Sequence, residues 1–152
     1  MVTIHRVLFP TDFSEYSRAA RTYAIDFAIK FEAELHVLHV VQDPMVFLPD
    51  PAMAIPPAFA DVKEIDDAAK QSLENLPLPS ELSVVRAVRH GPAFLEILHY
   101  CREHSIDLTV LGTHGRSGLS HVLMGSTAEK VVRKAPCPVL TVRPSEHKFE
   151  MP

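Results

Sequence analysis

The sequence is poor in glycine and cysteine and contains no tryptophan. Among its 152 residues there are five glycines and two cysteines, Cys101 and Cys137. The cysteines form no CxxC pair, and no Cys/His spacing is typical of a zinc site, so a structural zinc centre is not expected. The sequence leaves open whether the two cysteines form a disulfide. Two thiols in a chain without a signal peptide are explained most simply as reduced and cytoplasmic. Cys137, between two prolines, is explained as a small hydrophobic residue with no lowered pKa.

An excess of positive charge and long apolar runs are also absent. The chain has 15 Lys and Arg against 19 Asp and Glu, a net charge of −4 and a pI near 6.1. Nucleic acids and anionic membranes attract concentrated positive charge, so neither is expected as a partner. No apolar stretch reaches the roughly 20 residues that cross a bilayer. The length and the hydrophobic fraction of 47% predict a single globular domain over residues 1–152.

Hydrophobic periodicity predicts strands that alternate with helices. Strand candidates are residues 4–9, 34–41, 82–89, 107–111 and 138–142, and helix candidates are 14–31, 61–75, 91–104 and 126–134. The first helix is expected to bury one face, made of Ala20, Tyr23, Ala24, Phe27, Ala28 and Phe31. Such alternation is typical of an α/β fold, an open parallel sheet with helices on both faces. Residues 42–60 hold five of the thirteen prolines, and are either a lid or partner surface, or a loop packed over the sheet edge.

Ligands of open parallel sheets bind beyond the carboxyl ends of the strands, where the winding direction reverses. The loops at these ends are residues 10–14, 40–44, 90–92 and 112–126. The last of them is exceptional, because four of the five glycines lie between Gly112 and Gly125.

A strand, a glycine-rich loop and a helix N-terminus together favour phosphate binding. Backbone N–H groups and the positive end of the helix dipole attract an anion, and glycine removes the Cβ that would keep it away. Ser126 and Thr127 add hydroxyl donors, and Arg116 adds a charged one. The alternative is that the glycines only make turns, and that Ser126 and Glu129 form a capping box.

Several specific motifs are missing from this loop. It is not a Walker A loop, nor the dinucleotide G-x-G-x-x-G. A G-x-x-G occurs at 112–115, as in RNA-clamping loops, but four residues are a weak pattern in an acidic chain. No nucleophile-elbow motif is present.

Polar residues flank two other strands. Asp12 follows the first strand and either accepts hydrogen bonds from ribose hydroxyls or caps the next helix, with Glu15 three residues on. His36 and His39 have odd spacing in a strand, so they should point to opposite faces and are poorly placed to share a metal. His114 lies in the glycine-rich segment, where a phosphate contact or a shielded turn is favoured over a metal.

The spacing Gly112-x2-Gly115-x9-Gly125-Ser126 resembles the nucleotide-binding signature of the universal stress protein family. VLFPTDFSEYS at 7–17, DLTVLGTHGRSG at 107–118 and STAEKVVRKAPCPVLTVRP at 126–144 also resemble that family, in the same order. The resemblance covers the whole chain except the proline-rich loop. It implies a Rossmann-like, five-stranded parallel sheet in the order 3-2-1-4-5, with the first and fourth strands side by side.

The intact glycine signature resembles the ATP-binding branch of the family, and this implies a set of site residues. Asp12 and Gly112 would hold the ribose, and the backbone of Val40 would meet the adenine. Further site residues implied are Thr11, His114, Gly115, Arg116, Gly125, Ser126 and Thr127, most of them around the phosphates. The resemblance also implies a homodimer through residues 139–142. Mg or Mn would bind through the phosphates, because the chain has no carboxylate cluster.

Three functions agree with these observations. The first is an adenine-nucleotide-binding stress-response or signalling protein. The second is a slow ATPase or a self-phosphorylating phosphotransferase, with Ser117, Ser120, Ser126 or Thr127 as acceptor. The third is an interaction protein with a vestigial site. The absence of a motif that positions a base to activate water favours the first.

Overall fold

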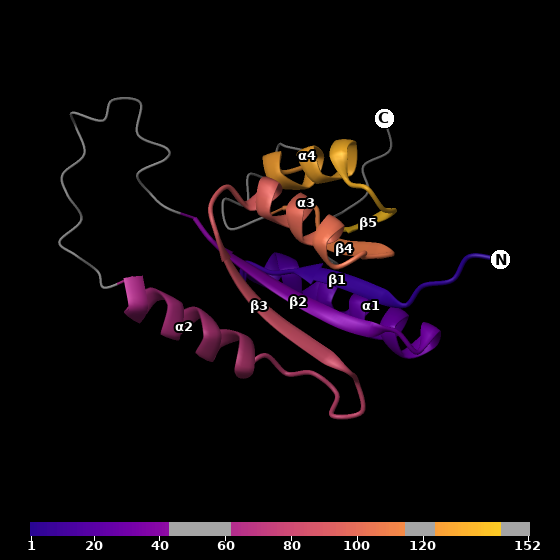
Figure 1. Ribbon diagram of the computed structural model, residues 1–152, viewed down its shortest axis with the longest axis horizontal. Helices are drawn as coiled ribbons and strands as arrows, with labels where there is room; N and C mark the ends of the chain where they lie inside the picture. Colours follow the sequence, from indigo (N-terminus) through magenta and orange to yellow (C-terminus); the bar gives the residue numbers. More distant parts are fainter. Residues whose placement is uncertain (43–61, 115–123, 144–152) are drawn as a thin grey trace.

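The computed structural model describes residues 1–42, 62–114 and 124–143, which form alternating strands and helices (Figure 1). The strands are β1 (Arg6–Pro10), β2 (Glu34–Val41), β3 (Val84–His90), β4 (Leu108–Gly112) and β5 (Val139–Val142). The helices are α1 (Glu15–Phe31), α2 (Val62–Glu74), α3 (Ala93–Glu103) and α4 (Ser126–Lys134). Every predicted element is confirmed, with bounds that differ by at most two residues. Residues 43–61, which include nearly all of the predicted proline-rich loop, lie outside the described residues.

All five strands are parallel and form one sheet in the order β3-β2-β1-β4-β5, which confirms the expected order. The chain winds outward from β1 to β3, then returns to place β4 on the other side of β1. The winding direction therefore reverses between β1 and β4, and their carboxyl ends form the edge where ligands of such sheets bind.

Helices cover both faces of the sheet, and each face has its own core. Figure 1 shows α3 and α4 together over one face, with α1 against the other and α2 beside β3. Side chains of a strand alternate between the two faces. Val7 and Phe9 therefore join the core under α1, while Leu8, between them, joins the core under α3 and α4.

The buried stripe of α1 consists of alanines. Ala20, Ala24 and Ala28 are fully buried at four-residue spacing, which is one face of a helix. The expectation that Tyr23 and Phe31 belong to this stripe is wrong, because they are 51% and 37% exposed. Small side chains let the helix axis approach the sheet closely, and larger ones have no room there. Among the described helices, none is long and apolar enough to cross a membrane.

Candidate functional site

The carboxyl edge between β1 and β4 is where the structure brings the predicted site residues together. The ladder between these strands consists of the pairs Val7 with Leu108 and Leu8 with Thr109. β1 continues to Pro10 and β4 to Gly112, beyond the last pair. β1 leads into α1 and β4 leads towards α4, so the N-termini of both helices lie at this edge. Each carries the partial positive charge of a helix dipole.

The turn between β1 and α1 is fixed by its own side chains. Asp12 Oδ1 accepts hydrogen bonds from the backbone N–H of Ser14 at 2.9 Å and from its hydroxyl at 2.6 Å. Thr11, which is buried, donates its N–H to Leu38 O at 2.9 Å. The N-cap of α1 is Ser14, so the alternative that Asp12 caps this helix is wrong. The carboxylate is instead held at the end of β1 by an Asx-type turn.

Phe13 lies in this turn with a positive φ of 63°, a strained conformation for a bulky residue. Its N–H donates to Thr11 Oγ1 at 3.0 Å, and its ring lies 4.5 Å from that of His39, centroid to centroid. His39 Nδ1 in turn donates to Thr11 O at 2.8 Å, which requires the hydrogen on Nδ1. These contacts hold the strained turn in one shape.

The backbone of Val40 faces the space beyond the end of β1. Successive residues of a parallel strand direct their N–H and C=O groups to opposite neighbours. Leu38 faces β1, since its carbonyl accepts from Thr11, and Val41 faces β3, since its carbonyl accepts from Gly91. Val40 therefore faces the β1 side, but β1 ends at Pro10, whose register partner is Leu38. This orientation offers one donor and one acceptor to a ligand.

Gly112 permits a close approach between the end of β4 and the first turn of α1. A Cβ on this residue would lie 2.9 Å from the carbonyl oxygen of Tyr16, shorter than real contacts of this kind. The glycine thus has a packing role in addition to the ribose contact that the resemblance implies.

The start of α4 is tied directly to the end of β4. The Gly125 N–H donates to Thr113 O at 2.6 Å, and the Thr113 N–H donates to Val142 O at 3.0 Å. Gly125 is the N-cap of α4, and no side-chain hydrogen bond caps this end among the described residues. The predicted capping box is therefore wrong, because Ser126 is the first helical residue and the Glu129 side chain pairs with Arg133. Ser126 and Thr127 begin the first turn, where backbone N–H groups have no partner within the helix.

His114 lies at the same edge, after Thr113. Its Nδ1 is 3.0 Å from Thr113 Oγ1, and its ring centroid is 6.3 Å from that of Tyr16. The predicted residues Gly115, Arg116, Ser117 and Ser120 lie outside the described residues. The structure thus brings Thr11, Asp12, Val40, Gly112, His114, Gly125, Ser126 and Thr127 to one edge of the sheet.

The buried contact between His36 and Tyr100 was missed by sequence reasoning. As predicted, His36 and His39 lie on opposite faces, and His36 points towards α3. Its Nε2 donates to Glu34 Oε1 at 2.9 Å, and its Nδ1 accepts from the Tyr100 hydroxyl at 2.9 Å. Burial lowers the pKa of His36, against the opposing effect of Glu34, and burial raises the pKa of Tyr100. The ring of His104 stacks on Tyr100 with centroids 4.0 Å apart.

The two cysteines also lie close together, as free thiols. Cys101 Sγ and Cys137 Sγ are each 3.4 Å from Thr109 Oγ1. The neighbouring Cys101 thiol is the main cause that lowers the pKa of Cys137 to about 6, with the Thr109 hydroxyl as a further cause. The expectation of an unperturbed Cys137 is therefore wrong. The 36-residue separation of the cysteines gave no indication of this contact.

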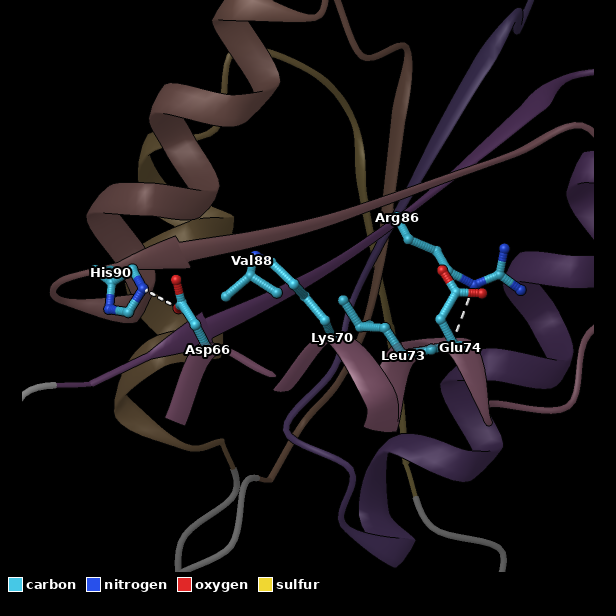
Figure 2. A pocket seen from close by; sticks show the side chains of 7 residues that line it. All are labelled: Asp66, Lys70, Leu73, Glu74, Arg86, Val88 and His90. Atoms are coloured by element: carbon cyan, nitrogen blue, oxygen red, sulfur yellow. Dashed lines mark hydrogen bonds and ion pairs between the residues drawn. The ribbon is translucent and has the colours of Figure 1, made fainter. Parts of the chain in front are cut away.

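A cavity of about 400 Å³ lies elsewhere, between α2 and the edge strand β3 (Figure 2). It is lined by Asp66, Lys70, Leu73, Glu74, Arg86, Val88 and His90. His90 Nε2 pairs with Asp66 Oδ1 at 2.6 Å, and Arg86 Nε donates to Leu73 O at 3.1 Å. Its charged groups thus partly satisfy one another, and none of the predicted site residues lines it.

Comparison with known proteins gives one family. The model of the universal stress protein family matches residues 3–143. Universal stress protein MJ0531 of Methanocaldococcus jannaschii is 32% identical over 139 residues, which are 91% of this chain and 81% of that protein. The solved structure of MJ0577 from the same organism is 26% identical, with a TM-score of 0.81 over 96% of this chain and 100% of that one. A universal stress protein in complex with cAMP shares the fold at 22% identity and a TM-score of 0.60, over 93% of this chain and 98% of that one. The chain belongs to the universal stress protein family.

Proposed function

We propose that this chain binds an adenine nucleotide, ATP in first place, at the carboxyl edge between β1 and β4, and acts as a stress-response and signalling protein. The observation that carries the proposal is the hydrogen bond from Gly125 to Thr113. It holds the N-terminus of α4, which no described side chain caps, against the end of β4. A helix N-terminus in this position attracts phosphate.

The other groups at this edge fit the rest of an adenine nucleotide. Asp12 is a carboxylate, which accepts hydrogen bonds from ribose hydroxyls, and it is held in place by Ser14. The backbone of Val40 offers a donor and an acceptor, which is what an adenine edge pairs with. The phosphate contacts of Gly115 and Arg116 stay predictions.

The choice of ATP rests on the glycine-rich segment between β4 and α4. The related protein in complex with cAMP supports an adenine nucleotide, but cAMP carries a single phosphate. A loop with four glycines, followed by the Ser126-Thr127 turn, offers more N–H and hydroxyl groups than one phosphate requires.

A divalent cation, Mg or Mn, would be held by the phosphate oxygens of the nucleotide. No group of three or more His, Cys, Asp or Glu could hold a metal in the part of the chain that the structure describes. Mg²⁺ commonly binds through substrate phosphates and one or two carboxylates. ATP affinity should therefore depend on the cation, while the chain without nucleotide should bind it weakly.

We also propose a homodimer through β5. The Pro138 carbonyl accepts from Thr109 of β4 and the Val142 carbonyl from Thr113 directly after it, so by alternation Thr141 directs its N–H away from the sheet. Thr141→Pro should remove that outward donor without touching the β4 ladder and give a monomer of 16.9 kDa by light scattering. Thr141→Val keeps the N–H and should remain a dimer. Two monomeric or two dimeric variants would contradict pairing through this edge.

The nucleotide site is tested on the freshly purified chain. Mass spectrometry of the ligand released by denaturation should find near-stoichiometric ATP or ADP. Calorimetric titration of the protein after removal of bound ligand should give a higher affinity for ATP with magnesium than for cAMP or GTP. A binding free energy of only about 4 kcal/mol already half-fills a site at ~1 mM ligand. An empty protein that binds no ATP at this concentration would therefore contradict the proposal. Phosphate release above that of Gly125→Ala would favour the slow-ATPase alternative.

A further inference from the structure

Cys101, Thr109 and Cys137 form a small cluster on the face of the sheet under α3 and α4. Cys101 lies on α3, Thr109 on β4, and Cys137 in the connection between α4 and β5. Both sulfur atoms are 3.4 Å from the Thr109 hydroxyl oxygen. Cys101 and Thr109 are buried, at 1% and 0% exposure, while Cys137 is partly exposed. The cluster therefore contains one cysteine at a partly exposed position and one that is buried.

The neighbours of Cys137 favour the thiolate form of its side chain. The neighbouring Cys101 thiol and the Thr109 hydroxyl lower the pKa of Cys137, although burial and Asp107 oppose them. The same interaction, together with burial, raises the pKa of Cys101. A cysteine thiolate is the form that reacts with electrophiles, so Cys137 is the nucleophile of the pair at neutral pH.

We propose that Cys137 is an oxidation site for hydroperoxides and that Cys101 is its resolving thiol. The Cys137 thiolate attacks one oxygen of the peroxide, the O–O bond breaks, and the leaving hydroxide or alkoxide takes up a proton as water or alcohol. Cys137 is then a sulfenic acid. Cys101 loses its proton and attacks the Cys137 sulfur, the S–O bond breaks, and water leaves. Two thiols thereby give two electrons to one peroxide and become one disulfide.

This disulfide would enclose the chain between α3 and β5. The enclosed segment contains β4, the glycine-rich segment and α4. The cross-link would fasten the start of β5 to α3 on the same face of the sheet. The inference does not depend on the proposed function, since the thiols lie outside the predicted nucleotide site.

The first experiment uses the reduced full-length chain, freed of reductant and treated with hydrogen peroxide. The intact mass should fall by about 2 Da, and both thiols should disappear with the same time course. Digestion without reductant should release a peptide that links Cys101 to Cys137. A product that only gains oxygen, or that links two chains, would overturn the proposal.

The second experiment separates the roles of the two thiols. Cys101→Ala should stop at the sulfenic acid, which dimedone traps on Cys137, and Cys137→Ala should slow the loss of the remaining thiol about tenfold or more. Equal rates for both single variants would contradict the assignment of Cys137 as the nucleophile. Circular dichroism checks that each variant is folded.

The third measurement tests the hydrogen bonds without removing a sulfur. The rate of Cys137 alkylation by iodoacetamide should rise with pH and level off above the pKa of Cys137, about 6. Thr109→Val removes the hydroxyl but keeps the side-chain shape, and should move this inflection to higher pH. Thr109→Ser restores the hydroxyl and should restore the inflection. An inflection near the ordinary cysteine value of about 8.5 in the wild-type chain would overturn the proposed activation.

Discussion

The backbone nitrogen of Gly125 lies 2.6 Å from the carbonyl oxygen of Thr113, so the two ends of the glycine-rich segment are joined by a hydrogen bond. The ends are fixed by backbone groups, which side-chain substitutions within the segment leave intact.

Gly125→Ala should weaken ATP binding while the chain stays folded. Gly125 has φ −65° and ψ 154°, which an alanine adopts without strain. A methyl group at the start of α4 would stand between the helix N–H groups and a phosphate, at a cost of about 1–3 kcal/mol. Calorimetry should then show an affinity roughly 5- to 150-fold lower. Unchanged affinity would place the phosphates elsewhere.

Gly112→Ala should lower the stability of the chain itself. The added Cβ would lie 2.9 Å from Tyr16 O, a backbone atom that moves only if α1 shifts. Such overpacking costs about 1–3 kcal/mol. Urea unfolding without nucleotide measures the loss, as the difference between the midpoints of the wild type and Gly112→Ala. Equal midpoints for wild type and Gly112→Ala would show that α1 has room to move.

Asp12→Asn and Asp12→Ala should separate the two uses of this side chain. Asparagine keeps an oxygen that accepts from Ser14, so the turn survives, but the charged acceptor for ribose is lost. ATP affinity should fall by about 1.5–3 kcal/mol, the value of a hydrogen bond to a charged group. Asp12→Ala should lose stability without nucleotide as well. If Asp12→Asn binds ATP like the wild type, the ribose contact is refuted.

The buried His36 should make stability depend on pH near neutrality. Its folded-state pKa lies below the ordinary value of 6.5, chiefly because of burial. The unfolded chain therefore binds more protons as the pH falls through 6.5, and the stability that neutral His36 contributes above this value is lost on acidification.

Urea midpoints between about pH 7.5 and about pH 5.5 measure this effect. His36→Gln cannot titrate, so its midpoint should fall less over the same interval, even if it starts lower. Parallel pH profiles for the wild type and His36→Gln would assign the effect to other histidines.

The order of elements could be predicted because short apolar strands and amphipathic helices leave distinct periods in the sequence. α4 was predicted at its observed bounds, Ser126–Lys134. The buried face of α1 was predicted only in part, because periodicity does not distinguish Ala24, with no exposure, from Tyr23 beside it. How close a helix lies to a sheet is decided by all the side chains between them.

The polar contacts were harder to predict than the elements. The carboxylate of Asp12 was expected either to cap α1 or to face a ligand. In the structure its Oδ1 accepts a hydrogen bond from the Ser14 N–H. The contact between Cys101 and Cys137 depends on the packing of α3 against the end of α4, which no local pattern encodes. Residue spacing predicts which edge a side chain reaches, but hydrogen-bond partners depend on atomic positions.

The ladder of only two residue pairs between β1 and β4 divides the sheet into two halves. Helix α1 packs against β1 and β2 on one side of this seam and against β4 and β5 on the other. Helix α1 therefore braces the boundary between the two halves, and its alanine face allows it to lie close to the strands on both sides. On the opposite face the core under α3 and α4 joins Leu8 and Leu38 to Leu111, so amide hydrogens of β1 and β4 should exchange with solvent only when the helices of both faces detach.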